Sequence, residues 1–202
     1  MPLDIFLAGT NFTFITKKYI IKISNYKRID FLNNEFESCK LFEICSKSYE
    51  KQQFEKATNK EAFFKGEDVL FLEKIDAKPL SYFLDSAKFL VYFKNMLEKL
   101  NGLHSKYGFI HSDLHIDNVL VSENDIYFID FDYKLKDSVA DKHYIDILHV
   151  ILLLKKEYPR YFLMYKKDIE NIIFNIYDKE KLQNVYLQNR CFFMDYLDEF
   201  FR

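Results

Sequence analysis

The stretch that decides the fold is His111-Ser112-Asp113-Leu114-His115-Ile116-Asp117-Asn118, which is followed by Ile129-Asp130-Phe131-Asp132. Asp113 and Asn118 are five residues apart, and Asp130 comes directly after a short apolar segment. Taken singly, Asp113 suits a turn, Asn118 a helix cap and Asp130 the end of a strand. Taken together, they supply one carboxylate that can accept a proton and two oxygen donors of the kind that Mg²⁺ prefers.

This combination resembles the catalytic loop and the metal-binding segment of the protein-kinase-like phosphotransferase superfamily. The forms His-x-Asp-Leu-His-x-x-Asn and Ile-Asp-Phe-Asp are most similar to the lipopolysaccharide-core (Kdo) kinase, RIO-like and aminoglycoside/choline kinase branches. The resemblance covers roughly residues 8–155 and implies an α+β, bilobal protein-kinase-like fold with Mg-ATP between a β-rich N-lobe and a helical C-lobe. It further implies that Asp113 is the base and that Asn118 and Asp130 are the metal ligands.

The pattern of the chain predicts two lobes, with residues 1–75 as the N-lobe and 76–202 as the C-lobe. In the N-lobe, alternation predicts a hairpin over 11–16 and 19–23 and a strand over 69–73, and Asp30 caps a helix that runs to about Tyr49. In the C-lobe we expect a turn at 78–80, a helix over 86–106, strands over 119–121 and 126–129, and helices from His143 onward that Pro159 interrupts.

Lys22 lies inside the apolar segment Ile20-Ile21-Lys22-Ile23, where a lysine either extends to the solvent at a sheet edge or reaches a phosphate. The resemblance implies the second role and an ion pair with a helix glutamate. On a helix starting at Phe31, Glu35 falls at about 40°, within the apolar stripe, and Glu37 at about 240°, outside it. We therefore pair Lys22 with Glu35, and two unrelated surface charges remain the alternative.

Two further nucleotide contacts follow from the resemblance. Leu72-Glu73-Lys74-Ile75 resembles the hinge between lobes, where the backbone of Glu73 and Ile75 would bond an adenine edge, although a plain strand-to-loop transition fits as well. Gly-x-Gly-x-x-Gly is absent, so the phosphate-covering loop can contain at most Gly9. Phe131-Asp132 replaces Phe-Gly, and Asp132 is either a further metal ligand or a solvated carboxylate.

Three residues around the catalytic loop have predicted structural roles. His111 would brace the loop, and Asp146 resembles the buried helix aspartate that ties this loop to the lower lobe. His104 resembles the histidine that ends the preceding helix, and we expect it to be structural.

Composition excludes several classes of protein. Hydrophobic residues make up 49% of 202 residues, with 22 Phe and 15 Tyr, so the chain folds. A net charge of −2 argues against nucleic acid as a partner.

The three cysteines, Cys39, Cys45 and Cys191, fit no metal or disulfide pattern and are expected to be buried thiols. The longest apolar run, residues 145–154, is about half the length of a membrane span, so we expect a cytoplasmic protein that contacts a membrane at most peripherally.

These observations predict an ATP-dependent kinase that transfers the γ-phosphate to a hydroxyl of a sugar or other small molecule, with a lipopolysaccharide or surface-glycan core sugar favoured. A minimal RIO-like Ser/Thr protein kinase is the alternative, although the missing activation segment disfavours docking of a protein substrate. A nucleotide-binding pseudokinase is a third class, against which the set Lys22, Glu35, Asp113, Asn118 and Asp130 argues. Lys134, Lys136 and Lys142 would either attract an anionic glycan or form a solvated face.

Overall fold

The computed structural model describes residues 4–8, 11–24, 48–50, 69–130, 141, 143–189, 197–198 and 200–201. The chain divides into two compact units, one of residues 1–76 with 131–133 and the other of residues 77–130 with 134–202.

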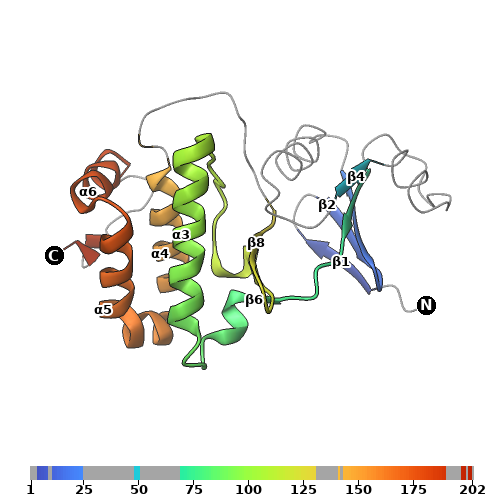
Figure 1. The fold of residues 1–202 in the computed structure, drawn as a ribbon, viewed down its shortest axis with the longest axis horizontal. Helices are drawn as coiled ribbons and strands as arrows, with labels where there is room; N and C mark the ends of the chain where they lie inside the picture. The colour runs from blue at the N-terminus through green and yellow to red at the C-terminus, as the bar shows by residue number, and fades with distance from the viewer. Residues whose placement is uncertain are drawn as a thin grey trace. The chain divides into compact units, whose positions relative to one another are not determined.

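Unit 1 is built on a five-stranded sheet with the strand order β1-β2-β3-β5-β4 (Figure 1). All neighbouring strands are antiparallel, and their bounds are β1 Asp4–Ala8, β2 Asn11–Ile15, β3 Tyr19–Ser24, β4 Ser48–Glu50 and β5 Val69–Glu73. Thr16 closes the β2–β3 hairpin, because its Oγ1 accepts the Tyr19 N–H at 2.9 Å and its own N–H donates to the Tyr19 carbonyl at 2.8 Å. The predicted hairpin and the predicted strand over 69–73 are thus confirmed.

Two short strands correct the sequence prediction. The predicted C-terminal end of the helix from Asp30 to about Tyr49 is wrong, because Ser48–Glu50 forms strand β4 and Tyr49 pairs with Phe71 of β5. The rest of that helix lies outside the described residues. The expected turn at 78–80 begins as strand β6, Lys78–Pro79, at the edge of a sheet. An edge is where a sheet tolerates proline, which has no N–H to donate.

Unit 2 combines a small sheet with helices. The sheet has the order β6-β7-β8, where β7 is Val119–Val121 and β8 is Ile126–Phe128. The remaining elements are the 3-10 helices η1 (Leu80–Phe83) and η2 (Ile116–Asn118) and the α-helices α3 (Phe89–Tyr107), α4 (Tyr144–Glu157), α5 (Pro159–Ile176) and α6 (Lys179–Gln188). Helix α5 packs against both α3 and α4, and α6 packs against α4.

The helices begin and end where the sequence provides signals. Helix α3 buries Phe89, Phe93 and Met96 completely and stops at Gly108, whose φ of 63° suits glycine and whose N–H bonds the His104 carbonyl at 2.9 Å. Pro159 opens α5, as proline favours the first helical position. Asp178 caps α6 by accepting the Lys181 N–H at 2.9 Å.

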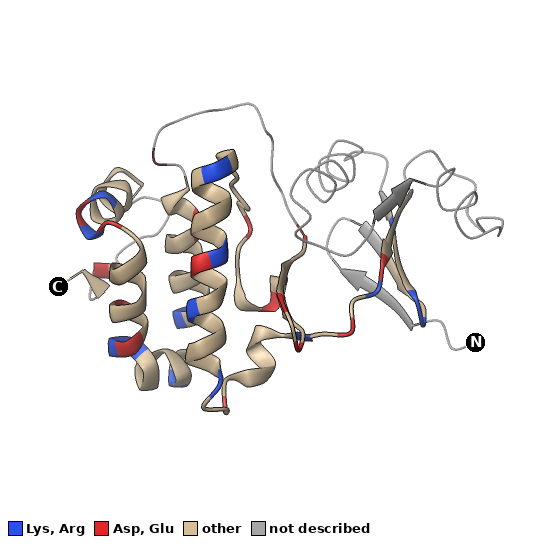
Figure 2. Cartoon of the chain, in the orientation of Figure 1, with Lys and Arg blue, Asp and Glu red and all other residues tan. Residues whose placement is uncertain are grey.

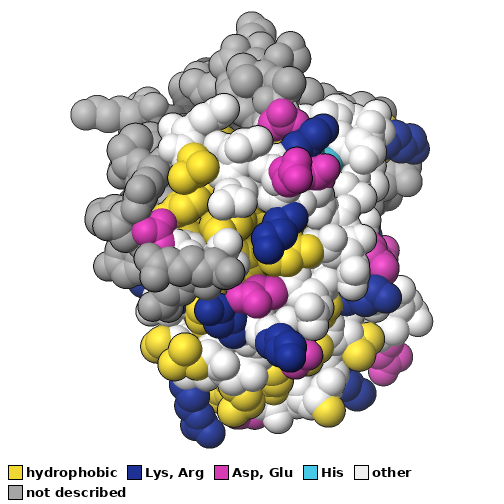
Figure 3. All heavy atoms as spheres, turned by 90° about the vertical axis from the view of Figure 1, so that its left-hand side faces the viewer, with side chains coloured by type: hydrophobic (Ala, Val, Ile, Leu, Met, Phe, Trp, Pro, Cys, Tyr) yellow, Lys and Arg dark blue, Asp and Glu magenta, His cyan; other side chains and the backbone are white. Residues whose placement is uncertain are grey.

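Charges are mixed rather than segregated on unit 2. Figure 2 shows basic and acidic residues next to one another along α3 and α5. On the face in Figure 3, exposed hydrophobic side chains alternate with charged ones. Among the described helices, none has the length and hydropathy that crossing a membrane requires.

Candidate active site

Asn118 connects two of the predicted site residues to one another. It ends η2, its side chain is buried, and its Nδ2 donates to the backbone carbonyl of Asp113 at 3.0 Å. Its backbone carbonyl accepts the Ile129 N–H at 3.0 Å, directly before Asp130. The loop that carries Asp113 and the segment that carries Asp130 are therefore both bonded to one residue.

The β7–β8 hairpin explains why these segments meet. Val119 pairs with Phe128, so Asn118 and Ile129 continue the same ladder at the open end of the hairpin. Asp130 then turns out of the strand with a φ of 59°, a left-handed conformation that aspartate tolerates better than most residues. Asp113 and Asp130 both expose their side chains, whereas Asn118 is buried.

The donor set of Asn118 and Asp130 fits a magnesium ion. The Asn118 Nδ2 donates to the Asp113 carbonyl, which leaves the amide oxygen Oδ1 as the atom that could serve as a ligand. Together with the Asp130 carboxylate it supplies hard oxygen donors, and Mg²⁺ needs only one or two such protein ligands beside phosphate and water.

His111 lies buried between the acidic residues of the site. Burial lowers the pKa of its imidazole, and this effect exceeds the opposing effect of the carboxylates of Asp146, Asp113 and Asp130. The ring also packs edge-on against Phe128, with the ring centres 6.2 Å apart. A neutral histidine therefore supports the loop, in agreement with its predicted bracing role.

Asp146 holds the loop that begins at His111 through its backbone, as the resemblance implies. Its carboxylate, in the first turn of α4, is completely buried. It accepts the N–H groups of His111 and Ser112, each at 2.8 Å, and lies 3.1 Å from His104 Nε2. These bonds hold Ser112 at a φ of 63°, a conformation that costs a non-glycine residue about 1 kcal/mol or more.

Sequence reasoning missed Tyr177, which extends this network. Its hydroxyl lies 3.2 Å from His104 Nδ1, and burial raises its pKa far above the ordinary value, so the hydroxyl stays protonated. Tyr177 follows α5, in the part of the chain that the resemblance does not cover. The predicted structural role of His104 is confirmed, since the imidazole connects Asp146 to Tyr177.

A second network that sequence reasoning missed surrounds Asp117, inside η2. Asp117 accepts hydroxyl hydrogen bonds from Ser81, at a short distance, and from Tyr158 at 2.8 Å. His115 and Glu157 place further ligand-type atoms nearby, and this is the one such group of three among the described residues. Because each Asp117 oxygen already accepts a hydroxyl, we assign no metal to it.

The predicted nucleotide-binding residues of unit 1 are described only in part. Lys22 is buried in β3, between Thr13 of β2 and Leu70 of β5 in register. Glu73 ends β5 and is exposed, and Ile75 is half-buried two residues later. Lys74 N–H, between them, donates to the Lys18 carbonyl at 2.7 Å.

Several residues with a predicted role lie outside the part of the chain that the structure describes. They are Gly9 and Glu35 of the nucleotide site, Asp132 after the metal segment, the lysines Lys134, Lys136 and Lys142, and the three cysteines Cys39, Cys45 and Cys191.

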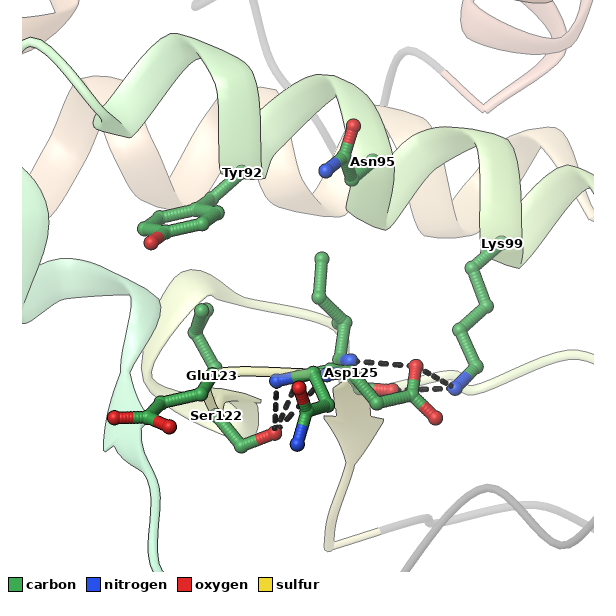
Figure 4. Close-up of a pocket in the computed structure, with 9 residues that line it drawn as sticks. Tyr92, Asn95, Lys99, Ser122, Glu123 and Asp125 are labelled. Atoms are coloured by element: carbon green, nitrogen blue, oxygen red, sulfur yellow. Dashed lines mark hydrogen bonds and ion pairs between the residues drawn. The ribbon is translucent and has the colours of Figure 1, made fainter.

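A cavity of about 230 Å³ opens between α3 and the β7–β8 turn. Figure 4 shows Tyr92, Asn95 and Lys99 on its α3 side, with Lys99 reaching Asp125 of the turn at 2.8 Å. Lys99 Nζ also donates to the Ile126 carbonyl at 2.6 Å. The cavity contains none of the predicted site residues, and its one lysine is bound to the turn.

Known proteins resemble this chain in both sequence and fold. The model of the phosphotransferase enzyme family (APH) matches residues 48–135, a segment that contains Asp113, Asn118 and Asp130. No curated protein matches the sequence.

Two solved structures are similar to the chain. A choline/ethanolamine kinase family protein from Mesorhizobium loti is 12% identical with a TM-score of 0.54, over 100% of this chain and 86% of that chain. The kinase domain of maize SIRK1 (sucrose-induced receptor kinase 1), bound to AMP-PNP, is 14% identical with a TM-score of 0.39, over 65% of this chain and 51% of that chain.

The likeness to the first structure shows a kinase-like fold, which confirms the predicted α+β fold class. The family match and this fold together support the protein-kinase-like superfamily. The family match supports a phosphotransferase that acts on a hydroxyl group, which confirms the enzyme class predicted from the sequence.

Proposed function

We propose that this chain is an ATP-dependent kinase that transfers the γ-phosphoryl group to a hydroxyl of a sugar or another small molecule. The favoured acceptor is a core sugar of lipopolysaccharide or of another surface glycan, and the reaction takes place in the cytoplasm. The observation that carries the proposal is the position of Asn118, bonded on one side to the Asp113 loop and on the other to the segment before Asp130.

Each residue has one task in the proposed reaction. Asp113 orients the acceptor hydroxyl and takes its proton as the oxygen attacks the γ-phosphorus. The bond from that phosphorus to the β–γ bridging oxygen breaks, and ADP leaves. Asn118 Oδ1 and the Asp130 carboxylate would hold the Mg²⁺ that neutralises charge on the phosphates.

The remaining assignments concern the nucleotide. We assign Lys22, paired with Glu35, to the phosphates, Gly9 to the loop above them, and the backbone of Glu73 and Ile75 to the adenine. Burial of Lys22 within β3 supports its assignment, since a lysine is almost never buried without a partner.

A small-molecule acceptor is favoured over a protein acceptor. The family match is to phosphotransferases in general, and the fold is that of a choline/ethanolamine kinase family protein. The sequence has no long activation segment with which a protein substrate could dock. The preference for a glycan sugar rests on the motif forms His-x-Asp-Leu-His-x-x-Asn and Ile-Asp-Phe-Asp.

The test begins with nucleotide binding and then measures transfer. Thermal unfolding of wild type, Asp113→Ala and Asp130→Ala is measured with ATP, with and without Mg²⁺, because a ligand of the folded state raises the melting temperature. We expect a Mg²⁺-dependent rise in wild type and Asp113→Ala and its loss in Asp130→Ala. Asp125→Asn, which changes an exposed carboxylate at the far end of the same hairpin, is the control.

Transfer of radiolabelled γ-phosphate to core-sugar acceptors, to small alcohols and to serine peptides then identifies the acceptor. Loss of the base should lower turnover by roughly 10² to 10⁴. Wild-type turnover in Asp113→Ala would remove that residue as the base. Labelling of the peptides alone would support the RIO-like protein kinase, and nucleotide binding without any transfer would support the pseudokinase.

A further inference from the structure

The carboxylate of Asp117 is bonded by hydroxyls from two distant parts of unit 2. Ser81 Oγ, in η1, donates to Oδ1, and the Tyr158 hydroxyl, between α4 and α5, donates to Oδ2 at 2.8 Å. The donors lie 36 and 41 residues away from Asp117 in sequence. Both oxygens of the carboxylate are therefore held from outside the catalytic loop.

Both donors are themselves fixed by backbone hydrogen bonds. The Ser81 carbonyl accepts the Leu84 N–H at 3.2 Å. Tyr158 donates its N–H to the Leu154 carbonyl at 3.0 Å, and its own carbonyl accepts the Phe162 N–H at 2.9 Å. The hydroxyls are thus presented from helix ends whose positions are set by the packing of unit 2.

Asp117 lies in an element that needs such support. η2 is three residues long and has no side-chain cap, and short 3-10 turns have little stability of their own. Asn118, the next residue, ends this turn, and its N–H bonds the His115 carbonyl at 3.0 Å. Movement of the turn would therefore move the Asn118 side chain.

We infer that Asp117 is a positioning residue, through which Ser81 and Tyr158 fix the turn Ile116–Asn118 and with it Asn118, whose Oδ1 would hold the metal ion. This inference rests on the proposed function, because it assumes that Asn118 binds Mg²⁺ when nucleotide is present. Replacing a group that orients a metal ligand typically lowers metal affinity by roughly 10- to 100-fold.

A pair of matched variants tests the inference. Tyr158→Phe removes only one hydroxyl, the one that bonds Asp117 and also Ser81. Tyr161→Phe removes a hydroxyl of the same kind in the next turn, one that donates to Asp85 at 2.7 Å and does not touch the catalytic loop. Binding of Mn²⁺ in the presence of ADP is measured by electron paramagnetic resonance, and melting temperatures are measured without ligands.

We expect Tyr158→Phe to weaken Mn²⁺ binding by roughly 10-fold and Tyr161→Phe to leave it unchanged, with similar small falls in melting temperature. Ser81→Ala, which removes the other hydroxyl, should act like Tyr158→Phe, and it replaces that variant if the latter does not fold. Equal Mn²⁺ affinity in the two tyrosine variants would overturn the inference alone. Wild type that binds no Mn²⁺ with ADP would overturn the proposed function and the inference with it.

Discussion

Replacing Asp146 with asparagine should destabilise the protein far more than the loss of one exposed charge. The carboxylate is completely buried, accepts two backbone N–H groups at 2.8 Å each and lies 3.1 Å from His104 Nε2. An asparagine side chain has a single acceptor oxygen, so in Asp146→Asn one of these N–H groups faces an amide NH₂ instead.

The magnitude follows from these contacts. A buried donor left unpaired costs about 1–3 kcal/mol, and a hydrogen bond that loses its charged acceptor weakens by about 1 kcal/mol. We therefore expect a loss of about 3 kcal/mol in the free energy of unfolding, a large share of the roughly 5–15 kcal/mol that domains have.

Urea unfolding followed by far-UV circular dichroism measures this loss, and the chain has no tryptophan that could serve as a fluorescent probe instead. Glu98→Gln is the control, because Glu98 is exposed on α3, 3.6 Å from Lys94, and such a pair contributes about 0.5 kcal/mol or less. A loss below about 1 kcal/mol in Asp146→Asn would refute the argument that this carboxylate holds the catalytic loop.

Three further predictions concern the same region. Tyr177→Phe removes the hydroxyl beside His104 Nδ1 and should lower the free energy of unfolding by about 1 kcal/mol, as measured by urea unfolding. Ser112→Gly should fold at least as stably as wild type, whereas Ser112→Val should lose about 1 kcal/mol or more, because a β-branched residue disfavours a φ of 63°. Burial lowers the pKa of both His111 and His143, so below about pH 6.5 the unfolded chain binds more protons than the folded chain does. Stability should therefore be full above that pH and fall as pH drops, and His143→Gln should reduce the fall in melting temperature between about pH 7.5 and about pH 5.5.

The parts of the fold that could be predicted from sequence depend on local patterns. Alternation over 11–15 and 19–24 matches β2 and β3, and the 3.6-residue spacing of apolar side chains matches α3 to within three residues at its start. The short strands β4 and β6 were missed, because three or two residues give no period to detect. Each exists through pairing with a strand elsewhere in the chain.

In the candidate site, too, residues of a local motif could be predicted from the sequence, and residues that come from distant parts of the chain could not. Asp113, Asn118 and Asp130 could be selected because they lie within 18 residues and share a motif. Ser81, Tyr158 and Tyr177 could not, since they reach the network from 36 to 73 residues away and a lone hydroxyl carries no signal in a sequence. The left-handed conformation of Ser112 was equally hidden, because serine seldom adopts it.

The hydrogen bonds that hold the catalytic loop have a consequence for how this protein could change over time. Asp146, His104, Tyr177, Ser81 and Tyr158 all belong to unit 2, as do Asp113, Asn118 and Asp130. Substitutions in residues 1–76 therefore replace none of the residues that make these bonds, so that segment can diverge while the hydrogen-bonded support of the Asp113 loop keeps its own residues. By contrast, an early stop between Asp132 and Tyr177 would leave every motif residue in place and would still remove the Tyr177 hydroxyl, which lies beside His104 in the network under the loop.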